Sequence, residues 1–159
     1  MDTMNEKQLT LDKRYIRMAS IWAENSYCTR RKVGALIVKN QMIISDGYNG
    51  TPSGFENICE DDNGVTKPYV LHAEANAIIS AARRDIVGGT LYLVGRDAQT
   101  GELLSDATSC SMCRRQIINS GLERVVIRKT PTEFEVVEVE EWIRNDDSLP
   151  NLDEILDRQ

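Results

Sequence analysis

The sequence predicts an α/β domain in which a mixed β-sheet carries helices on both faces. Its 159 residues suit one domain with a single core. Short β-rich runs alternate with stretches of helical period, and the strand–helix–strand order of the second half requires parallel neighbouring strands. Hydrophobic residues make up 41% and charged residues 28%, a balance that argues against a disordered or fibrous chain.

The first half predicts a helix, a β-hairpin and a long loop. Apolar residues recur at helical spacing over residues 11–25. The apolar runs 33–38 and 42–46 are separated by three turn-forming residues, so we expect them to pair as a hairpin. Residues 49–70 contain three glycines and two prolines and lack periodicity. Loops of this length are usually functional or disordered, and a variable surface excursion is the alternative.

The second half alternates helices and strands. Helical spacing returns over residues 71–84, with Gly88 and Gly89 beyond as a stop signal. The remaining expected elements are a strand at 90–94, an excursion at 95–105, a helix at 110–119, strands at 124–128 and 134–139, and a helix around residue 140.

Acidic residues are concentrated at the C-terminal end. The net charge is −6, yet residues 133–159 carry ten acidic and two basic side chains, a net of −8. Residues 1–132 then carry 17 basic and 15 acidic side chains, a net of +2. We therefore divide the chain into a main domain, residues 1–145, and an acidic tail, residues 146–159. The charge argues against a nucleic acid polymer as partner, whereas the body can bind a small anion.

The expected location is cytoplasmic. The N-terminal segment has no apolar core of a signal peptide, and no stretch approaches ~18 uninterrupted apolar residues, so we expect no membrane partner. Cytosolic thiols stay reduced, so the four cysteines are expected to be ligands or core residues, although their even number also fits two disulfides.

The rarest residues define the candidate metal site. The only histidine opens a predicted helix in the motif His72-Ala73-Glu74, and Cys110-x-x-Cys113 opens another. Residues three apart at a helix start share one face, and the helix dipole favours the thiolate form of cysteine. One imidazole and two thiolates suit Zn²⁺ and leave a fourth position for water, which is typical of a catalytic zinc site.

Glu74 is the candidate catalytic residue. It lies too close to His72 in a helix to bind the same ion, so its carboxyl group can serve as a proton shuttle beside the water. Hydrolysis at an amidine-like carbon needs hydroxide, and it needs an acid that protonates the ring nitrogen and the leaving amine. The alternative is a structural zinc in a non-catalytic partner-binding module, with Cys28 or Cys59 as fourth ligand.

These motifs resemble the zinc deaminase signature of the cytidine deaminase-like superfamily. The wider context resembles the deoxycytidylate deaminases over about residues 11–129: Cys28-Thr-Arg-x-x-Val-Gly-Ala35, Gly47-Tyr-Asn-Gly-Thr-Pro-Ser-Gly54 and His72-Ala-Glu-Ala-Asn-Ala77. The resemblance implies a three-layer α/β/α sandwich with a five-stranded mixed sheet of order 2-1-3-4-5. It also implies hydrolysis of dCMP to dUMP and ammonia with one catalytic Zn²⁺. The alternatives within this chemistry are cytidine, dCTP, guanine or a tRNA adenosine.

The resemblance implies further site residues. Asn49 would contact the sugar, and the backbone of Ala73 would read the pyrimidine edge. A fork-shaped guanidinium, backbone N–H groups and hydroxyls would hold the 5′-phosphate. The candidate phosphate ligands are Arg30, Gly50, Thr51 and Ser53.

Regulation and assembly are also implied by the resemblance. Some family members are hexamers with dCTP and dTTP as effectors, and Mg²⁺ would accompany the nucleotide. Arg83 matches an effector-site position by its spacing from Glu74. We therefore expect a homo-oligomer, with a hexamer favoured over a dimer or tetramer.

Three features depart from the family's pattern. Ser109 stands where the family usually has proline. Residues 95–107 replace a shorter link, and this insertion can reshape either the mouth of the pocket or an oligomer contact. Cys28 and Cys59 have no imidazole partner, because His72 is already committed. We expect them to be buried thiols or a reduced pair rather than a second zinc site completed by an acid such as Glu60.

Overall fold

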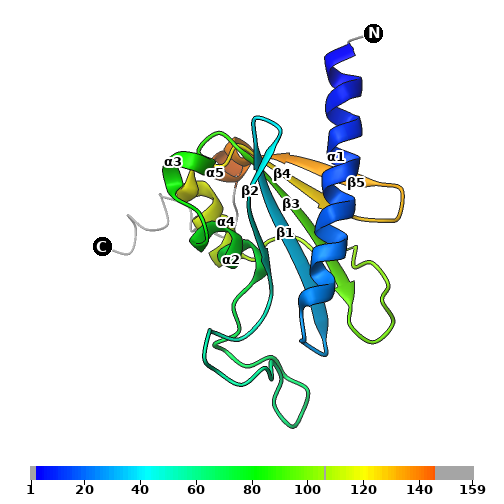
Figure 1. The fold of residues 1–159 in the computed structure, drawn as a ribbon, viewed down its shortest axis with the longest axis vertical. Helices are drawn as coiled ribbons and strands as arrows, with labels where there is room; N and C mark the ends of the chain where they lie inside the picture. Colours follow the sequence, from blue (N-terminus) through cyan, green and yellow to red (C-terminus); the bar gives the residue numbers. More distant parts are fainter. Residues whose placement is uncertain (1–2, 106, 146–159) are drawn as a thin grey trace.

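The computed structural model of the chain describes residues 3–105 and 107–145, which form three layers (Figure 1). The helices are α1 (Thr3–Trp22), continued by a 3₁₀ turn (Ala23–Asn25), α2 (Ala73–Ile79), α3 (Arg83–Ile86), α4 (Ser111–Ser120) and α5 (Val139–Asn145). The strands are β1 (Arg31–Lys39), β2 (Met42–Tyr48), β3 (Thr90–Asp97), β4 (Arg124–Arg128) and β5 (Phe134–Glu138). The acidic tail predicted at 146–159 lies outside the described residues.

The sheet confirms the expected order, β2-β1-β3-β4-β5. Strands β3 and β4 are parallel and connected through α4, whereas the other neighbouring pairs are antiparallel. The β1–β2 hairpin turns at Asn40 and Gln41, which have φ angles of 52° and 61°. Two consecutive positive φ angles match the right-handed twist of the strands, so this tight connection fixes the hairpin.

The segment predicted as one helix over residues 71–84 is divided in two. Helix α2 ends at Ile79, and the extended backbone of Ala82, with ψ of 139°, precedes α3. The Asn76 carbonyl accepts both the Ser80 N–H, at 3.1 Å, and the Ser80 hydroxyl, at 2.7 Å, and such a side-chain bond favours a bend of the helix at this point. Ile79 is 72% exposed, and the buried face of α2 is formed by Ala73 and Ala77 instead, so the prediction of a single helix with one apolar stripe is wrong.

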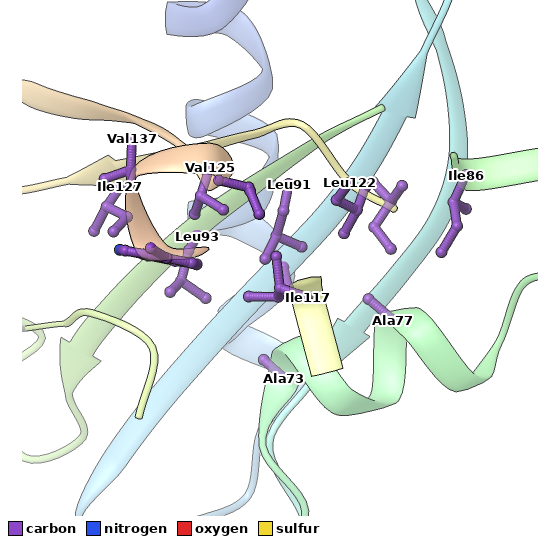
Figure 2. Close-up of a cluster of buried hydrophobic side chains, with 14 residues drawn as sticks. Ala73, Ala77, Ile86, Leu91, Leu93, Ile117, Leu122, Val125, Ile127 and Val137 are labelled. Carbon is purple, nitrogen blue, oxygen red and sulfur yellow. The ribbon is translucent and has the colours of Figure 1, made fainter. Parts of the chain in front are cut away.

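The main core fills the space between the sheet and α2, α4 and α5 (Figure 2). Small residues let α2 approach the sheet closely: Ala73 and Ala77 are fully buried, and both face β2 at Gly47. A Cβ atom at Gly47 would meet the Ala73 carbonyl oxygen at 2.4 Å, so only glycine allows this contact. The contact fixes the start of α2, and with it His72 and Glu74.

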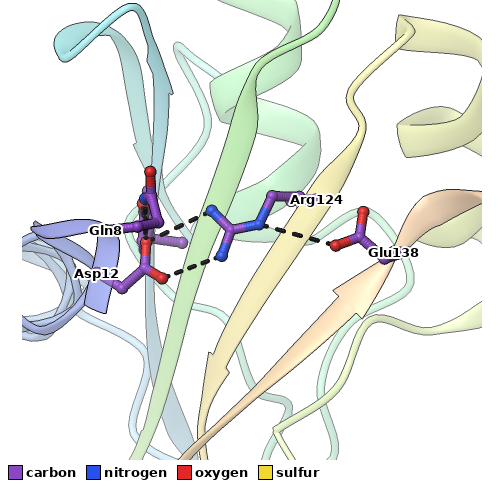
Figure 3. A network of polar contacts seen from close by, with 5 residues as sticks. Gln8, Asp12, Arg124 and Glu138 are labelled. Carbon is purple, nitrogen blue, oxygen red and sulfur yellow. Dashed lines mark hydrogen bonds and ion pairs between the residues drawn. The ribbon is translucent and has the colours of Figure 1, made fainter. Parts of the chain in front are cut away.

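Helix α1 is attached to the other face of the sheet by a buried ion pair (Figure 3). Arg124 Nη2 lies 3.0 Å from Asp12 Oδ2, and Asp12 also accepts hydrogen bonds from the Tyr92 hydroxyl and from Gln8. Burial raises the pKa of Tyr92, and Asp12 raises it further. These bonds replace the contacts with water that the Asp12 carboxylate loses on burial, so the network holds α1 against the sheet.

Among the described residues, no helix combines the length and the apolar character needed to cross a membrane.

Candidate active site and metal centre

The starts of two neighbouring helices bring the candidate ligands together. His72 is the residue before α2, Cys110 is the N-cap of α4, and Cys113 lies in the first turn of α4. His72 Nδ1 is 3.2 Å from Cys113 Sγ and 3.5 Å from Cys110 Sγ. The ligand atoms of the three residues all lie within 4.8 Å of one another. The structure therefore assembles the set that the sequence suggested.

The arrangement fits zinc. Tetrahedral zinc with nitrogen at ~2.0 Å and sulfur at ~2.3 Å separates its ligand atoms by about 3.5 Å, close to the distances between the imidazole and the two sulfurs. A mixed imidazole and thiolate donor set also favours zinc over Mg²⁺ or Ca²⁺. The backbone N–H of Cys113 donates to Cys110 Sγ at 3.5 Å, which adds to the positive potential at the helix start.

Glu74 lies beside the ligand cluster. Its side chain is 4% exposed, in the first turn of α2. Burial raises the pKa of the Cys113 thiol, and the nearby Glu74 carboxylate raises it further. A cation bound to the sulfur reverses this tendency, because thiolate is the form that binds metal. The site thus places one carboxylate next to the ligands without adding it to them.

The cluster opens onto a cavity of about 440 Å³, within the size range of small-molecule sites. Three of the predicted substrate-binding residues line it together with His72, Cys110 and Glu74: Arg30, Asn49 and Ala73. Leu104, Ala107 and Thr108 line it as well, so the excursion at 95–107 does reach the pocket, as the sequence suggested.

Asn49 joins the cavity wall to the sheet. Its Oδ1 accepts the N–H of Val33 at 2.8 Å, and its Nδ2 donates to the carbonyl of Arg31 at 2.8 Å. These two bonds fix the side chain against β1, and the amide keeps a second N–H and a second lone pair for a ligand.

Gly50, Thr51 and Ser53 do not line this cavity. The N–H of Gly50 donates to the carbonyl of Leu71, and the N–H of Thr51 donates to the Tyr27 hydroxyl. The expectation that these two N–H groups are open is therefore wrong. These bonds join the start of the loop to Leu71 and Tyr27. Of the predicted phosphate ligands, only Arg30 lines the cavity.

Cys28 and Cys59 form a disulfide, which overturns the expectation of reduced thiols. The loop after β2 folds back so that Cys59 reaches the segment before β1, and the two Cα atoms are 5.2 Å apart. Because each sulfur is bonded to the other, neither supplies a fourth ligand to the His72 cluster. Glu60 lies close to both sulfurs, but this second group of donors is closed by the covalent bond.

Glu60 is a cavity residue that the sequence interpretation left without a substrate role. It lines the pocket, is 9% exposed, and accepts two backbone N–H groups through Oε1. The sequence offered one signal for Glu60: it directly follows a cysteine in a long loop without periodicity. The sequence does not show, however, which backbone groups the carboxylate contacts.

Comparison with known proteins gives consistent results. Residues 9–129 match the family model of the cytidine and deoxycytidylate deaminase zinc-binding region. A deoxycytidylate deaminase of Mycobacterium phage D29 is 32% identical over 132 residues, covering 74% of this chain and 94% of the relative. The Saccharomyces cerevisiae deoxycytidylate deaminase is 32% identical over 124 residues, covering 72% of this chain but 36% of that longer protein.

Two solved structures share the fold of this chain. The dCMP deaminase of cyanophage S-TIM5, in complex with dCMP and dUMP, has a TM-score of 0.61 and 34% identity, covering 80% of this chain and 83% of the other. A cytidine deaminase from Burkholderia pseudomallei, at 22% identity and a TM-score of 0.52, covers 79% of this chain and 91% of the other, and it shares the fold.

Proposed function

Because the chain belongs to the cytidine and deoxycytidylate deaminase family, we propose that it hydrolyses dCMP to dUMP and ammonia. The observation that carries the proposal is the convergence of His72, Cys110 and Cys113 beside the buried Glu74, at the wall of a cavity sized for a small molecule. The similar cyanophage enzyme, whose structure contains dCMP and dUMP, and the phage relative support the choice of substrate.

His72, Cys110 and Cys113 are the residues that would hold Zn²⁺. When bound, zinc supplies the Lewis acidity that makes water nucleophilic near neutral pH. Two thiolates would neutralise the charge of the cation, and three protein ligands would leave one coordination position for water. With Cys28 and Cys59 joined to each other, the described residues offer no further free thiol to close that position.

Glu74 moves the protons of the reaction. Its carboxylate takes a proton from the attacking water and delivers it to N3 of the pyrimidine. As the C4–N bond breaks, the carboxylate takes the remaining proton from the new hydroxyl at C4 and passes it to the departing amine, which leaves as ammonia, and a carbonyl remains at C4. Glu74 lines the same cavity as His72 and Cys110, which places its carboxyl group at the proposed reaction site.

The cavity wall holds the rest of the nucleotide. We assign the sugar contact to Asn49, whose amide is fixed against β1, and the pyrimidine edge to the backbone of Ala73 at the first turn of α2. Arg30 lines the same cavity and carries the guanidinium suited to a phosphate. This assignment leaves Gly50 and Thr51 out of the phosphate site, because their N–H groups are already bonded.

The test is Glu74→Gln. Because an amide cannot shuttle protons, turnover of dCMP should fall by about 10²–10⁴-fold, while zinc content measured by atomic absorption stays the same. Retained turnover would overturn the mechanism.

A substrate panel tests the assignment of dCMP. Ammonia release should be fastest with dCMP among cytidine, deoxycytidine, dCMP, dCTP, guanine and a tRNA containing the reactive adenosine. A phosphate-binding residue at the cavity favours the monophosphate over the nucleosides. A preference for any other member of the panel would replace dCMP as the substrate.

Assembly, regulation and location extend the proposal. Ile79 and Met112 are 72% and 60% exposed on the neighbouring helices α2 and α4, which supports self-association, with a hexamer as the expected form. Arg83 lines a second cavity of about 390 Å³ between α3 and α4, where dCTP or dTTP with Mg²⁺ would bind. We also propose a cytoplasmic location, which requires that the Cys28–Cys59 bond persist in a reducing compartment. Light scattering with and without each nucleotide tests the first two points.

A further inference from the structure

The dipeptide Thr29-Arg30, between the 3₁₀ turn and β1, is held by a single carboxylate oxygen. Glu60 Oε1 accepts the backbone N–H of Thr29 and that of Arg30, each at 3.0 Å. Two consecutive N–H groups that converge on one point form the concave arrangement that binds anions in proteins. Here the anion is the protein's own side chain, so these N–H groups are not available to a substrate phosphate.

The carbonyl groups of the same dipeptide are held from a different part of the chain. The N–H of Ala98 donates to the Arg30 carbonyl at 3.1 Å, and Gln99 Nε2 donates to the Thr29 carbonyl at 2.8 Å. Both donors belong to the turn after β3, where Asp97 Oδ1 accepts the N–H of Gln99 at 2.9 Å. The excursion that distinguishes this chain thus contacts the backbone that carries Arg30.

Glu60 is itself fixed in place. It directly follows Cys59, which is bonded to Cys28, the residue before Thr29. It also pairs with Thr66 in an isolated antiparallel bridge across the loop. The two segments that meet at Glu60 are therefore held together by a covalent bond one residue away and by backbone hydrogen bonds.

We propose that Glu60 and Gln99 are positioning residues for the 5′-phosphate, acting through the backbone of Thr29-Arg30. The inference rests on the proposed function. All four backbone polar groups of the dipeptide are bonded, so the Arg30 guanidinium starts from a fixed point on the cavity wall. Preorganisation lowers the entropic cost of binding. Because only a phosphorylated substrate meets Arg30 in this way, the benefit applies to dCMP and not to deoxycytidine.

The experiment compares the two substrates in Glu60→Ala and Gln99→Ala. In Glu60→Ala, KM for dCMP should rise roughly tenfold, as expected for loss of a charge-assisted hydrogen-bonded contact, while kcat/KM for deoxycytidine stays within about twofold of wild type. Gln99→Ala removes one neutral hydrogen bond from an exposed side chain, so the rise should be smaller, about threefold.

Two further variants separate reach from charge. Glu60→Gln keeps an acceptor oxygen at the same distance and should restore most of the affinity for dCMP, whereas Glu60→Asp keeps the charge but shortens the side chain and should not. Glu56→Gln is the matched control, because this exposed residue lies on the same loop and loses the same charge. In an Arg30→Ala background, Glu60→Ala should add no further rise in KM, since it acts through Arg30.

The outcomes are distinguishable. If wild type does not turn over dCMP, the proposed function fails, and this inference fails with it. If wild type is active but Glu60→Ala lowers turnover of both substrates equally, Glu60 is merely structural and the inference is overturned. Should Glu60→Ala not fold, Gln99→Ala decides: an unchanged KM for dCMP would refute the positioning role.

Discussion

Two cysteine pairs each contribute one residue to the lining of the same cavity, and the two pairs differ in oxidation state. Cys110 and Cys113 are free thiols that meet the imidazole of His72, whereas Cys28 and Cys59 are bonded to each other beside the carboxylate of Glu60. Each cluster offers two sulfurs and one further donor within a few ångströms. Counting metal-binding residue types therefore does not distinguish the two.

The difference lies in what else each donor binds. In the first cluster His72 Nδ1 lies close to both sulfurs. His72 and Cys110 also line the cavity, so the cluster is accessible from it. In the second cluster Glu60 Oε1 is occupied by two backbone N–H groups, and the sulfurs are used up by the covalent bond. The lesson is that remaining coordination capacity, more than donor count, marks a metal site.

The largest expected effect comes from removing one sulfur from each pair. Cys113→Ala should reduce zinc from about one equivalent to near zero and abolish turnover of dCMP, since two protein ligands hold zinc poorly. Cys59→Ala should leave zinc content unchanged, because this sulfur is not a ligand. Metal analysis of the purified variants, together with ammonia release, checks both.

A second arm of this experiment uses a chelator. Removing the metal from wild type should abolish turnover, and adding Zn²⁺ should restore it while the Cys28–Cys59 bond stays intact. Zinc loss in Cys59→Ala equal to that in Cys113→Ala would break the comparison, because both pairs would then be holding metal.

The sequence predicted the first cluster well and the second poorly, for a physical reason. His72 lies at the start of one helix, and Cys110 and Cys113 lie at the start of another; helix starts follow local signals that are visible in the sequence. Cys28 and Cys59 are 31 residues apart and meet through a loop without periodicity, so only the folded chain pairs them.

The same distinction between local and long-range signals applies to the fold. The hairpin and the strand at 124–128 have local patterns and were predicted correctly. The break of the helix at residues 80–82 does not interrupt the helical spacing of apolar residues in the sequence, so the pattern concealed it. The bonded N–H groups of Gly50 and Thr51 likewise depend on distant partners, Leu71 and Tyr27.

The next effect, in order of size, concerns stability. Replacing both residues of the disulfide, as Cys28→Ala with Cys59→Ala, should lower the free energy of unfolding by roughly 4 kcal/mol, the loss expected for a loop of this length. Urea denaturation measures it. A reducing phosphine should have a similar effect on wild type and none on the double variant.

This variant also separates stability from catalysis. Zinc content should stay at the wild-type level, and the loss of activity should fall mainly on the affinity for dCMP, because the bond holds Glu60 near Arg30. If the double variant is as stable as wild type, or if it loses zinc, then the Cys28–Cys59 pair does not have the purely structural role proposed for it.

The smallest effect concerns the buried serine beside each pair. Ser26, before Cys28, donates to the Asn49 carbonyl at 2.9 Å and accepts the N–H of Cys28 at 3.3 Å. Ser109, before Cys110, is 2% exposed, and its hydroxyl has no hydrogen-bond partner within the described part of the chain. Burying an unpaired hydroxyl is unfavourable, whereas a bonded one contributes to stability.

Alanine at the two positions should therefore have opposite effects. Ser26→Ala should lower the free energy of unfolding by about 1 kcal/mol, because it leaves the N–H of Cys28 and the carbonyl of Asn49 without this partner. Ser109→Ala should leave stability unchanged or raise it by up to about 1 kcal/mol, since it removes a desolvated hydroxyl. Thermal and urea unfolding of the zinc-loaded proteins compare them directly. If Ser109→Ala lowers the free energy of unfolding as much as Ser26→Ala does, the Ser109 hydroxyl must be hydrogen-bonded as Ser26 is. The two regions would then differ only in their sulfurs.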